Sequence, residues 1–311
     1  EVVLPEELPL IPEIPNGVRE AATRGVLIPF VGAGVSLLAG CPSWNDLART
    51  SLESFLEAGR FSFAQMEQLN HLSARIKLSI ALGLQSRTGT KIDFPKLVSP
   101  KNSYDFPKGR RIYGLLSSLA KTFVTTNYDE WLDKDIQLDR PTNLAAVEAP
   151  SASTVPPPRP VYYDVTDFTP ANLNSPGVFH IHGSLLKPEG MIMTTRQYLQ
   201  HYANDHHDVA IGKENRLLTF LEHLFQRKTV LFVGYGLEEL EILEYAIQKA
   251  RSPLSLDSKE TRHYILQGYF SHELELMRSM RDYYQRQCGI ELIPFRKDES
   301  ARCILRKFDR P

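Results

Sequence analysis

Short apolar runs alternate along the chain with longer stretches in which apolar and polar residues mix. The short runs end at polar or glycine-rich residues and predict buried strands over residues 27–31, 123–126, 178–181, 229–233, 263–267 and 290–295. Helices are predicted over residues 19–26, 43–58, 63–84, 112–119, 195–204, 214–227, 238–250, 272–287 and 298–308. Strands that alternate with helices are typical of a sheet covered by helices on both faces. The pattern therefore predicts an α/β fold of the Rossmann-like, doubly wound type with a mostly parallel sheet.

The longest helical stretch, over residues 46–120, does not fit a simple crossover between two strands. We expect it to form a helical lobe inserted into the α/β domain. Residues 1–16 contain four prolines and predict an extended arm, which leaves residues 17–311 as one domain. Prolines and polar residues also predict irregular structure over residues 86–108 and 140–176.

Several predicted strands end in residues that suit ligand binding. In open α/β sheets, ligands lie beyond the carboxyl ends of the strands, so these ends are expected to converge on one crevice. The ends in question are Gly32-Ala33-Gly34, Thr126-Asn127-Tyr128-Asp129, His182-Gly183-Ser184 and Gly234-Tyr235-Gly236.

The first of these strand ends has the strand–turn–helix pattern that brings a backbone against the phosphates of a dinucleotide. Gly32 permits a tight turn without a Cβ, and Gly34 permits a close approach of the chain to a ligand. The free N–H groups that open the next helix would then face the anion. The third glycine of the usual dinucleotide fingerprint is missing, so the prediction depends on the other strand ends as well.

Composition narrows the class of protein. Apolar residues make up 42% and charged residues 23% of the 311 residues, as in an ordinary globular protein. The net charge of −1 shows no basic excess, so direct nucleic-acid binding is not expected. No apolar run approaches the length of about 18 residues that spans a bilayer, and the first residues lack the pattern of a signal peptide, so no membrane association is expected.

The cysteines are too few for a structural zinc site made of four thiolates. The chain has three, Cys41, Cys288 and Cys303, and none of them forms a Cys-x-x-Cys pair. An odd and sparse set of thiols suits a reducing compartment, so a cytoplasmic location without a metal is expected.

The strand-end motifs together resemble those of the sirtuins. The segment Gly32-Ala33-Gly34-Val35-Ser36, followed by Gly40-Cys41-Pro42 and Trp44, looks like the sirtuin cofactor loop. Thr125–Asp129 resembles the Thr-Gln-Asn-x-Asp element, His182-Gly183 the His-Gly element, and Gly234–Leu237 the late Gly-x-Ser-Leu element near the adenosine. The resemblance implies that NAD is bound by Gly32, Ala33, Gly34, Ser36, Trp44, Thr126, Gly183, Gly234, Tyr235 and Gly236.

The departures from the sirtuin pattern point to one branch of the sirtuin-like proteins. The zinc cysteines of the deacylases are missing, Ser43-Trp44-Asn45 replaces Asp-Phe-Arg, and Gly236 replaces the late serine. These features resemble the bacterial sirtuin-like proteins that consume NAD in anti-phage defence. The implied activity is hydrolysis of NAD to nicotinamide and ADP-ribose. The alternatives are a catalytically silent nucleotide-binding scaffold and, disfavoured by the missing cysteines, a protein deacylase.

The chemistry of this hydrolysis assigns roles to particular residues. Nicotinamide leaves NAD as a neutral molecule, so the site needs no strong general acid; it must stabilise an oxocarbenium-like ribose and present a water. Asn127 can orient that water or a ribose hydroxyl, and His182 can accept a proton near neutral pH. Asp129 can hold a donor nearby or fix the entrance of the helix after the strand. Ser36 can reach a phosphate oxygen, and Trp44 can cover the ribose.

Structural roles compete with several of these assignments. Asn127 and Asp129 would also cap a helix, His182 would also be a packed histidine at a strand end, and Trp44 would also be a core aromatic. His180 is expected in the core or behind the site. His206-His207 suit a solvated loop better than a metal pair, and Glu238–Glu241 suit a helix start as well as a ribose contact.

The resemblance also bears on partners. An unregulated enzyme that destroys NAD would harm its host, so its activity is expected to be gated. Gating is expected from self-assembly or from a sensor chain, for which a HerA-type ATPase and a short Argonaute are precedents. The arm at residues 1–16 and the helices at 46–120 and 272–308 are the expected subunit contacts of a homo-oligomer.

Overall fold

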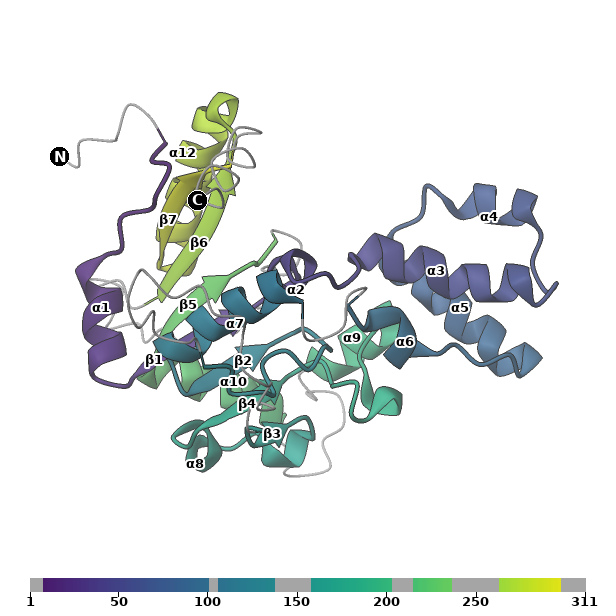
Figure 1. Ribbon diagram of the computed structural model, residues 1–311, viewed down its shortest axis with the longest axis horizontal. Helices are drawn as coiled ribbons and strands as arrows, with labels where there is room; N and C mark the ends of the chain where they lie inside the picture. Colours follow the sequence, from purple (N-terminus) through teal and green to yellow (C-terminus); the bar gives the residue numbers. More distant parts are fainter. Residues whose placement is uncertain (1–7, 101–105, 138–157, 203–214, 237–262, 298–311) are drawn as a thin grey trace, which may run out of the picture. The chain divides into compact units, whose positions relative to one another are not determined.

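The computed structural model describes residues 8–100, 106–137, 158–202, 215–236 and 263–297 (Figure 1). The chain divides into two compact units. Unit 1 comprises residues 1–32 and 218–311, and unit 2 comprises residues 33–217.

Unit 1 is built on parallel strands in the order β1-β5-β6-β7. Its elements are α1 (Asn16–Thr23), β1 (Leu27–Val31), α10 (Arg216–Arg227, of which the first two residues belong to unit 2), β5 (Thr229–Val233), β6 (His263–Tyr269), a 3-10 turn (Ser271–Glu273), α12 (Leu274–Tyr283), a π turn (Tyr284–Cys288) and β7 (Ile290–Arg296). All five residues of β1 are buried, because the strands of a parallel sheet are covered on both faces. Phe30 stacks on its register partner Phe232, with 5.2 Å between ring centroids.

Unit 2 combines a small parallel sheet with most of the helices. Its strand order is β3-β4-β2, and both pairings are parallel. Its elements are α2 (Ala33–Leu38), α3 (Trp44–Glu57), α4 (Phe63–Leu69), α5 (Ala74–Thr88), α6 (Phe94–Val98), α7 (Pro107–Leu119), β2 (Thr122–Thr125), β3 (Val161–Tyr162), a 3-10 turn (Val165–Asp167), α8 (Pro170–Leu173), β4 (Gly177–His180), a second 3-10 turn (Pro188–Gly190) and α9 (Thr195–Tyr202).

The helices α3 to α6 lie beside one another in unit 2 (Figure 1). They share a hydrophobic core in which Leu52, Phe55 and Leu78 are almost fully buried. The same core includes Tyr128, which lies in the turn after β2, and Met191. The helical lobe therefore packs on the segment that carries the strand-end residues, and it helps to hold that segment in place.

Every pairing between the described strands is parallel, and helices lie between β1 and β2, β3 and β4, β4 and β5, and β6 and β7 along the chain. The predicted Rossmann-like α/β class is thereby confirmed. The predicted helix over 43–58 is also confirmed as α3, with the Ser43 side chain accepting a hydrogen bond from the Asp46 N–H at its start.

Two local predictions in the lobe were wrong. The helix expected over 63–84 is two helices, because Ser73 at the N-cap of α5 starts a new helix after α4 ends. The loop expected over 86–108 contains α6, whose first turn is capped by Asp93 and begins with a proline at a position that tolerates it. The helix predicted over 272–287 begins with the 3-10 turn and ends in the π turn. The helices predicted over 238–250 and 298–308 lie outside the described residues.

Candidate active site

The turn after β2 places Thr126, Asn127 and Asp129 in a rigid backbone. The Asn127 N–H donates to Thr125 Oγ1 at 3.0 Å, and the Leu185 N–H donates to the Tyr128 carbonyl at 3.0 Å. The Tyr128 hydroxyl donates to the Ile192 carbonyl at 2.6 Å. The turn is thus tied to segments that follow β4, which leaves its polar side chains little freedom of direction.

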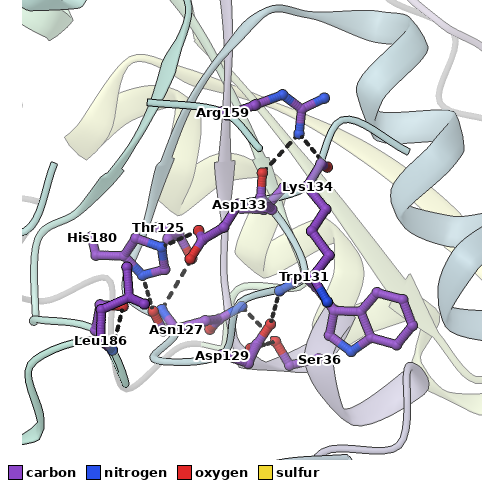
Figure 2. A network of polar contacts seen from close by, with 12 residues as sticks. Ser36, Thr125, Asn127, Asp129, Trp131, Asp133, Lys134, Arg159, His180 and Leu186 are labelled. Carbon is purple, nitrogen blue, oxygen red and sulfur yellow. Dashed lines mark hydrogen bonds and ion pairs between the residues drawn. The ribbon is translucent and has the colours of Figure 1, made fainter. Parts of the chain in front are cut away.

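Ser36, in the short helix α2, joins Asn127 to Asp129 (Figure 2). Asn127 Nδ2 donates to Ser36 Oγ at 2.7 Å, and Ser36 Oγ donates to Asp129 Oδ2 at 2.6 Å. Because the serine has only one proton, the 3.1 Å contact with the Tyr113 hydroxyl must be donated by the tyrosine. The hydroxyl therefore has a defined orientation, and it fixes the direction of the Asn127 amide.

Asp129 is buried and holds the turn together. Its second oxygen, Oδ1, accepts a hydrogen bond from the Trp131 N–H at 3.2 Å. Burial raises the pKa of Asp129 above its ordinary value, and the hydrogen bonds from Ser36 and Trp131 offset only part of that rise. A carboxyl group with a raised pKa at the end of a strand is typical of functional sites, although its bonds also stabilise the loop.

A pocket opens beside this network. Its volume is about 380 Å³, part of which is open to solvent. The lining includes Ala33, Ser36, Cys41, Trp44, Thr126, Asn127, Tyr128 and Asp129.

Trp44 forms one wall of the pocket from the first turn of α3. Its ring is half-buried and meets the Tyr128 ring edge-on, with 5.6 Å between centroids. The position agrees with either of its expected roles, because the ring both packs against the lobe and borders the pocket.

His182 lies just after β4 and packs against α9. Its Nε2 is 2.8 Å from the Tyr202 hydroxyl, and the Tyr198 ring meets it edge-on at 4.9 Å. Burial lowers the pKa of His182 well below its usual range, with further lowering by His201 and Arg75. The ring is therefore neutral at physiological pH, the form that can accept a proton. His182 is not among the residues that line the pocket.

His180 is fully buried behind the site, where the sequence placed it. Its Nδ1 is 2.7 Å from the Asn127 carbonyl, and its Nε2 is 2.8 Å from Asp133 Oδ1 (Figure 2). Asp133 was not predicted as a site residue. It looks in the sequence like any acid in a polar turn, so no local signal distinguishes it.

Two of the predicted glycines, Gly183 and Gly32, lie where a side chain would not fit. Gly183 has a φ of +89°, and a Cβ there would lie 2.7 Å from the Gly190 carbonyl oxygen. In unit 1, a Cβ on Gly32 would lie 2.6 Å from both the Gly234 carbonyl oxygen and the Tyr235 ring. The Gly32 N–H also donates to the Val233 carbonyl at 2.9 Å. These contacts require glycine for the close approach of two chain segments.

The predicted site residues fall into two groups. In unit 2, the structure brings Ala33, Ser36, Trp44, Thr126, Asn127 and Asp129 to one pocket. Gly34 lies in α2 of that unit, and Gly183 lies beside His182. The remaining residues Gly32, Gly234, Tyr235 and Gly236 belong to unit 1, where Tyr235 packs edge-on against Phe30 at 5.3 Å.

The fold and these residues define an α/β protein with a polar site after a parallel strand. A model of the SIR2-like domain matches residues 121–293, which is more than half of the chain. The chain belongs to this SIR2-like family, whose members are NAD-dependent enzymes. No curated protein matches the chain.

The matched range includes Asn127, His182 and Gly234, and it begins after the Gly-Ala-Gly segment. Among the described residues, no cluster of three or more histidine, cysteine or acidic side chains suits a metal ion. None of the helices in the described part of the chain is both long enough and apolar enough to cross a bilayer.

Proposed function

We propose that this protein hydrolyses the bond between nicotinamide and ribose in NAD. The observation that carries the proposal is the buried Ser36–Asn127–Asp129 network on the wall of a pocket in a SIR2-like chain. A buried amide that donates to a fixed serine hydroxyl can orient a water or a ribose hydroxyl with little reorganisation during the reaction.

The reaction consumes water and releases a proton. The water oxygen bonds to the anomeric carbon of the ribose, the bond from that carbon to the nicotinamide nitrogen breaks, and nicotinamide leaves as a neutral molecule. Asn127 would orient the water or a ribose hydroxyl. His182 would take up the released proton. Burial lowers its pKa, which leaves the ring unprotonated before the reaction and also makes it a weaker base. Asp129 would act through Ser36 by holding the serine hydroxyl in place.

Deacylation is the less favoured activity. The zinc module of the sirtuin deacylases needs four thiolates, and the whole chain has three cysteines. Cys41 and Cys288 are buried as free thiols in different units. A silent scaffold has one observation in its favour, because the Tyr202 hydroxyl occupies Nε2 of His182. For His182 to accept a proton at Nε2 during catalysis, its contact with Tyr202 would have to break.

We further propose that the enzyme acts as a defence effector that depletes NAD and is gated by assembly. The motifs shared with the bacterial anti-phage branch support this role, and so does the danger of unregulated NAD loss to the host. A homo-oligomer and a HerA-type ATPase, or another sensor chain, are the proposed gating partners. The proposed location is the cytoplasm, where NAD is available and thiols stay reduced.

The test is a nicotinamide-release assay on the purified chain, alone and co-expressed with the ATPase or sensor encoded beside it. We expect one nicotinamide per NAD consumed, strong activation by the partner, and an oligomer by light scattering. Asn127→Ala should abolish release while NAD binding persists. Binding of NAD without any turnover in the assembled complex would favour the scaffold. Release of nicotinamide only with an acylated peptide would favour the deacylase. A fully active monomer would refute the gating proposal.

A further inference from the structure

His180 joins the strand β4 to the loop that follows the turn at residues 126–129. It is the last residue of β4 and has no exposed surface. Its two ring nitrogens face two different oxygens, the Asn127 carbonyl at 2.7 Å and Asp133 Oδ1 at 2.8 Å. Figure 2 shows the ring between these partners. Both contacts span about fifty positions of sequence, so only the folded chain creates them.

The two contacts determine the protonation of the ring. A carbonyl oxygen and an ionised carboxylate can only accept hydrogen bonds, and a neutral imidazole carries one N–H. Both bonds are made at once when His180 is an imidazolium and Asp133 a carboxylate. Burial lowers the pKa of His180, but the Asp133 charge and the hydrogen bonds to Asp133 and Asn127 outweigh it, so the pKa is raised overall. The pKa of His180 is therefore raised, whereas the pKa of His182, two residues later, is lowered.

The loop that carries Asp133 is clamped by Arg159. The guanidinium donates to the carbonyls of Leu132 at 2.7 Å and Lys134 at 2.9 Å, on both sides of Asp133. It also pairs with Asp135 at 2.5 Å. The charged groups that act on His180 are Asp133 and, more weakly, Asp129, while Arg159 acts on Asp133. The main chain around Asp133 is therefore held in place independently of the ring that the carboxylate faces.

Asn127 is consequently held at three points. Its N–H donates to Thr125 Oγ1, its carbonyl accepts from His180, and its side-chain amide donates to Ser36. Two of these points fix the main chain, and the third fixes the amide. A rotation of the peptide group at position 127 would turn the amide away from Ser36 and from the pocket.

We infer that His180 and Asp133 form a buried ionic pair that positions Asn127 for catalysis through its main-chain carbonyl. The inference rests on the proposed hydrolysis of NAD, because it assigns the pair a role in that reaction. His180 and Asp133 are positioning residues, since they do not line the pocket. Their removal should lower the rate of the chemical step and leave substrate binding nearly unchanged.

The kinetic test uses His180→Gln and Asp133→Asn in the full complex, with Asp135→Asn as the matched control. Asp135 lies on the same loop and pairs with Arg159 rather than His180. We expect kcat to fall by about 10- to 100-fold in both variants with KM within about threefold of the parent, because small misplacements of a reacting group cost that much. The double variant should be no slower than the worse single variant, since the two residues act as one unit. A parallel rise in KM, or an equal loss in Asp135→Asn, would overturn the inference.

A second measurement does not depend on NAD turnover. Histidine side chains labelled with ¹⁵N should show an imidazolium signal at pH 8 that disappears in His180→Gln and becomes neutral in Asp133→Asn. The side-chain amide signal of Asn127 should shift in both variants and remain in place in Asp135→Asn. A neutral His180 in the parent, or an unmoved Asn127 signal, would refute the positioning role. A parent that shows the imidazolium but releases no nicotinamide would instead refute the proposed function.

Discussion

Removal of the Ser36 hydroxyl tests the network on which the site is built. Ser36→Ala deletes hydrogen bonds of 2.6 Å to Asp129, 2.7 Å from Asn127 and 3.1 Å from Tyr113. It leaves a buried carboxylate oxygen and a buried amide without this partner. Each such group costs about 1–3 kcal/mol. Because neighbouring waters and side chains recover part of that cost, we expect the free energy of unfolding to fall by about 2–4 kcal/mol, together with the loss of NAD hydrolysis.

The loss of stability in Ser36→Ala should depend on pH, and this dependence distinguishes it from the loss of an ordinary hydrogen bond. The hydrogen bond from Ser36 lowers the pKa of Asp129, so the variant should raise that pKa further. An acid whose pKa is raised in the folded state contributes stability at low pH and loses it as the pH increases. The difference between parent and variant should therefore be larger at pH 8 than at pH 5.

The assay is urea unfolding at both pH values, with Ser51→Ala as the control. Ser51 is also fully buried, and its hydroxyl donates to the Leu47 carbonyl at 2.7 Å within α3. Its removal should cost about 1 kcal/mol at either pH, the usual net worth of one hydrogen bond. If Ser36→Ala costs no more than the control, or costs the same at pH 5 and pH 8, the reasoning about the network is wrong.

Three further predictions use other parts of the molecule. Gly32→Ala should lower the free energy of unfolding by about 1–3 kcal/mol because its Cβ would meet the Gly234 carbonyl. Gly83→Ala should raise it by about 0.5–1 kcal/mol, because Gly83 lies in the exposed interior of α5 with nothing near its Cβ. Thermal unfolding of the two variants and the parent measures both effects. His182→Gln should lower turnover by about 100-fold or more. Because the pKa of His182 is lowered, the parent should lose stability as the pH falls through about 6.5, and the variant should lose less, as urea unfolding at pH 8 and pH 6 would show. Elemental analysis of tag-free protein should find no stoichiometric zinc, and zinc that leaves together with the fold on chelation would contradict this.

The local elements of the fold were largely predictable from the sequence. Strands such as β1 and β5 are continuous apolar runs because both of their faces are covered, and this pattern is visible without a structure. The start of α3 was also predictable, because Ser43 caps its own helix through a residue three positions away. The break between α4 and α5 was missed, since apolar residues continue through it at helical spacing, and the break lies in the extended backbone of Ser73 at the N-cap of α5.

The sequence by itself determined the α/β class and the residues that end the strands, because periodicity, glycine turns and caps act over a few neighbouring positions. It also pointed to Asn127, Asp129 and Ser36 as residue types that suit the chemistry. Only the tertiary structure decided how they meet, through hydrogen bonds between Ser36 and residues more than ninety positions away. It likewise decided that Asp133 raises the pKa of His180, because a carboxylate acts on a ring by distance in space and not by distance along the chain.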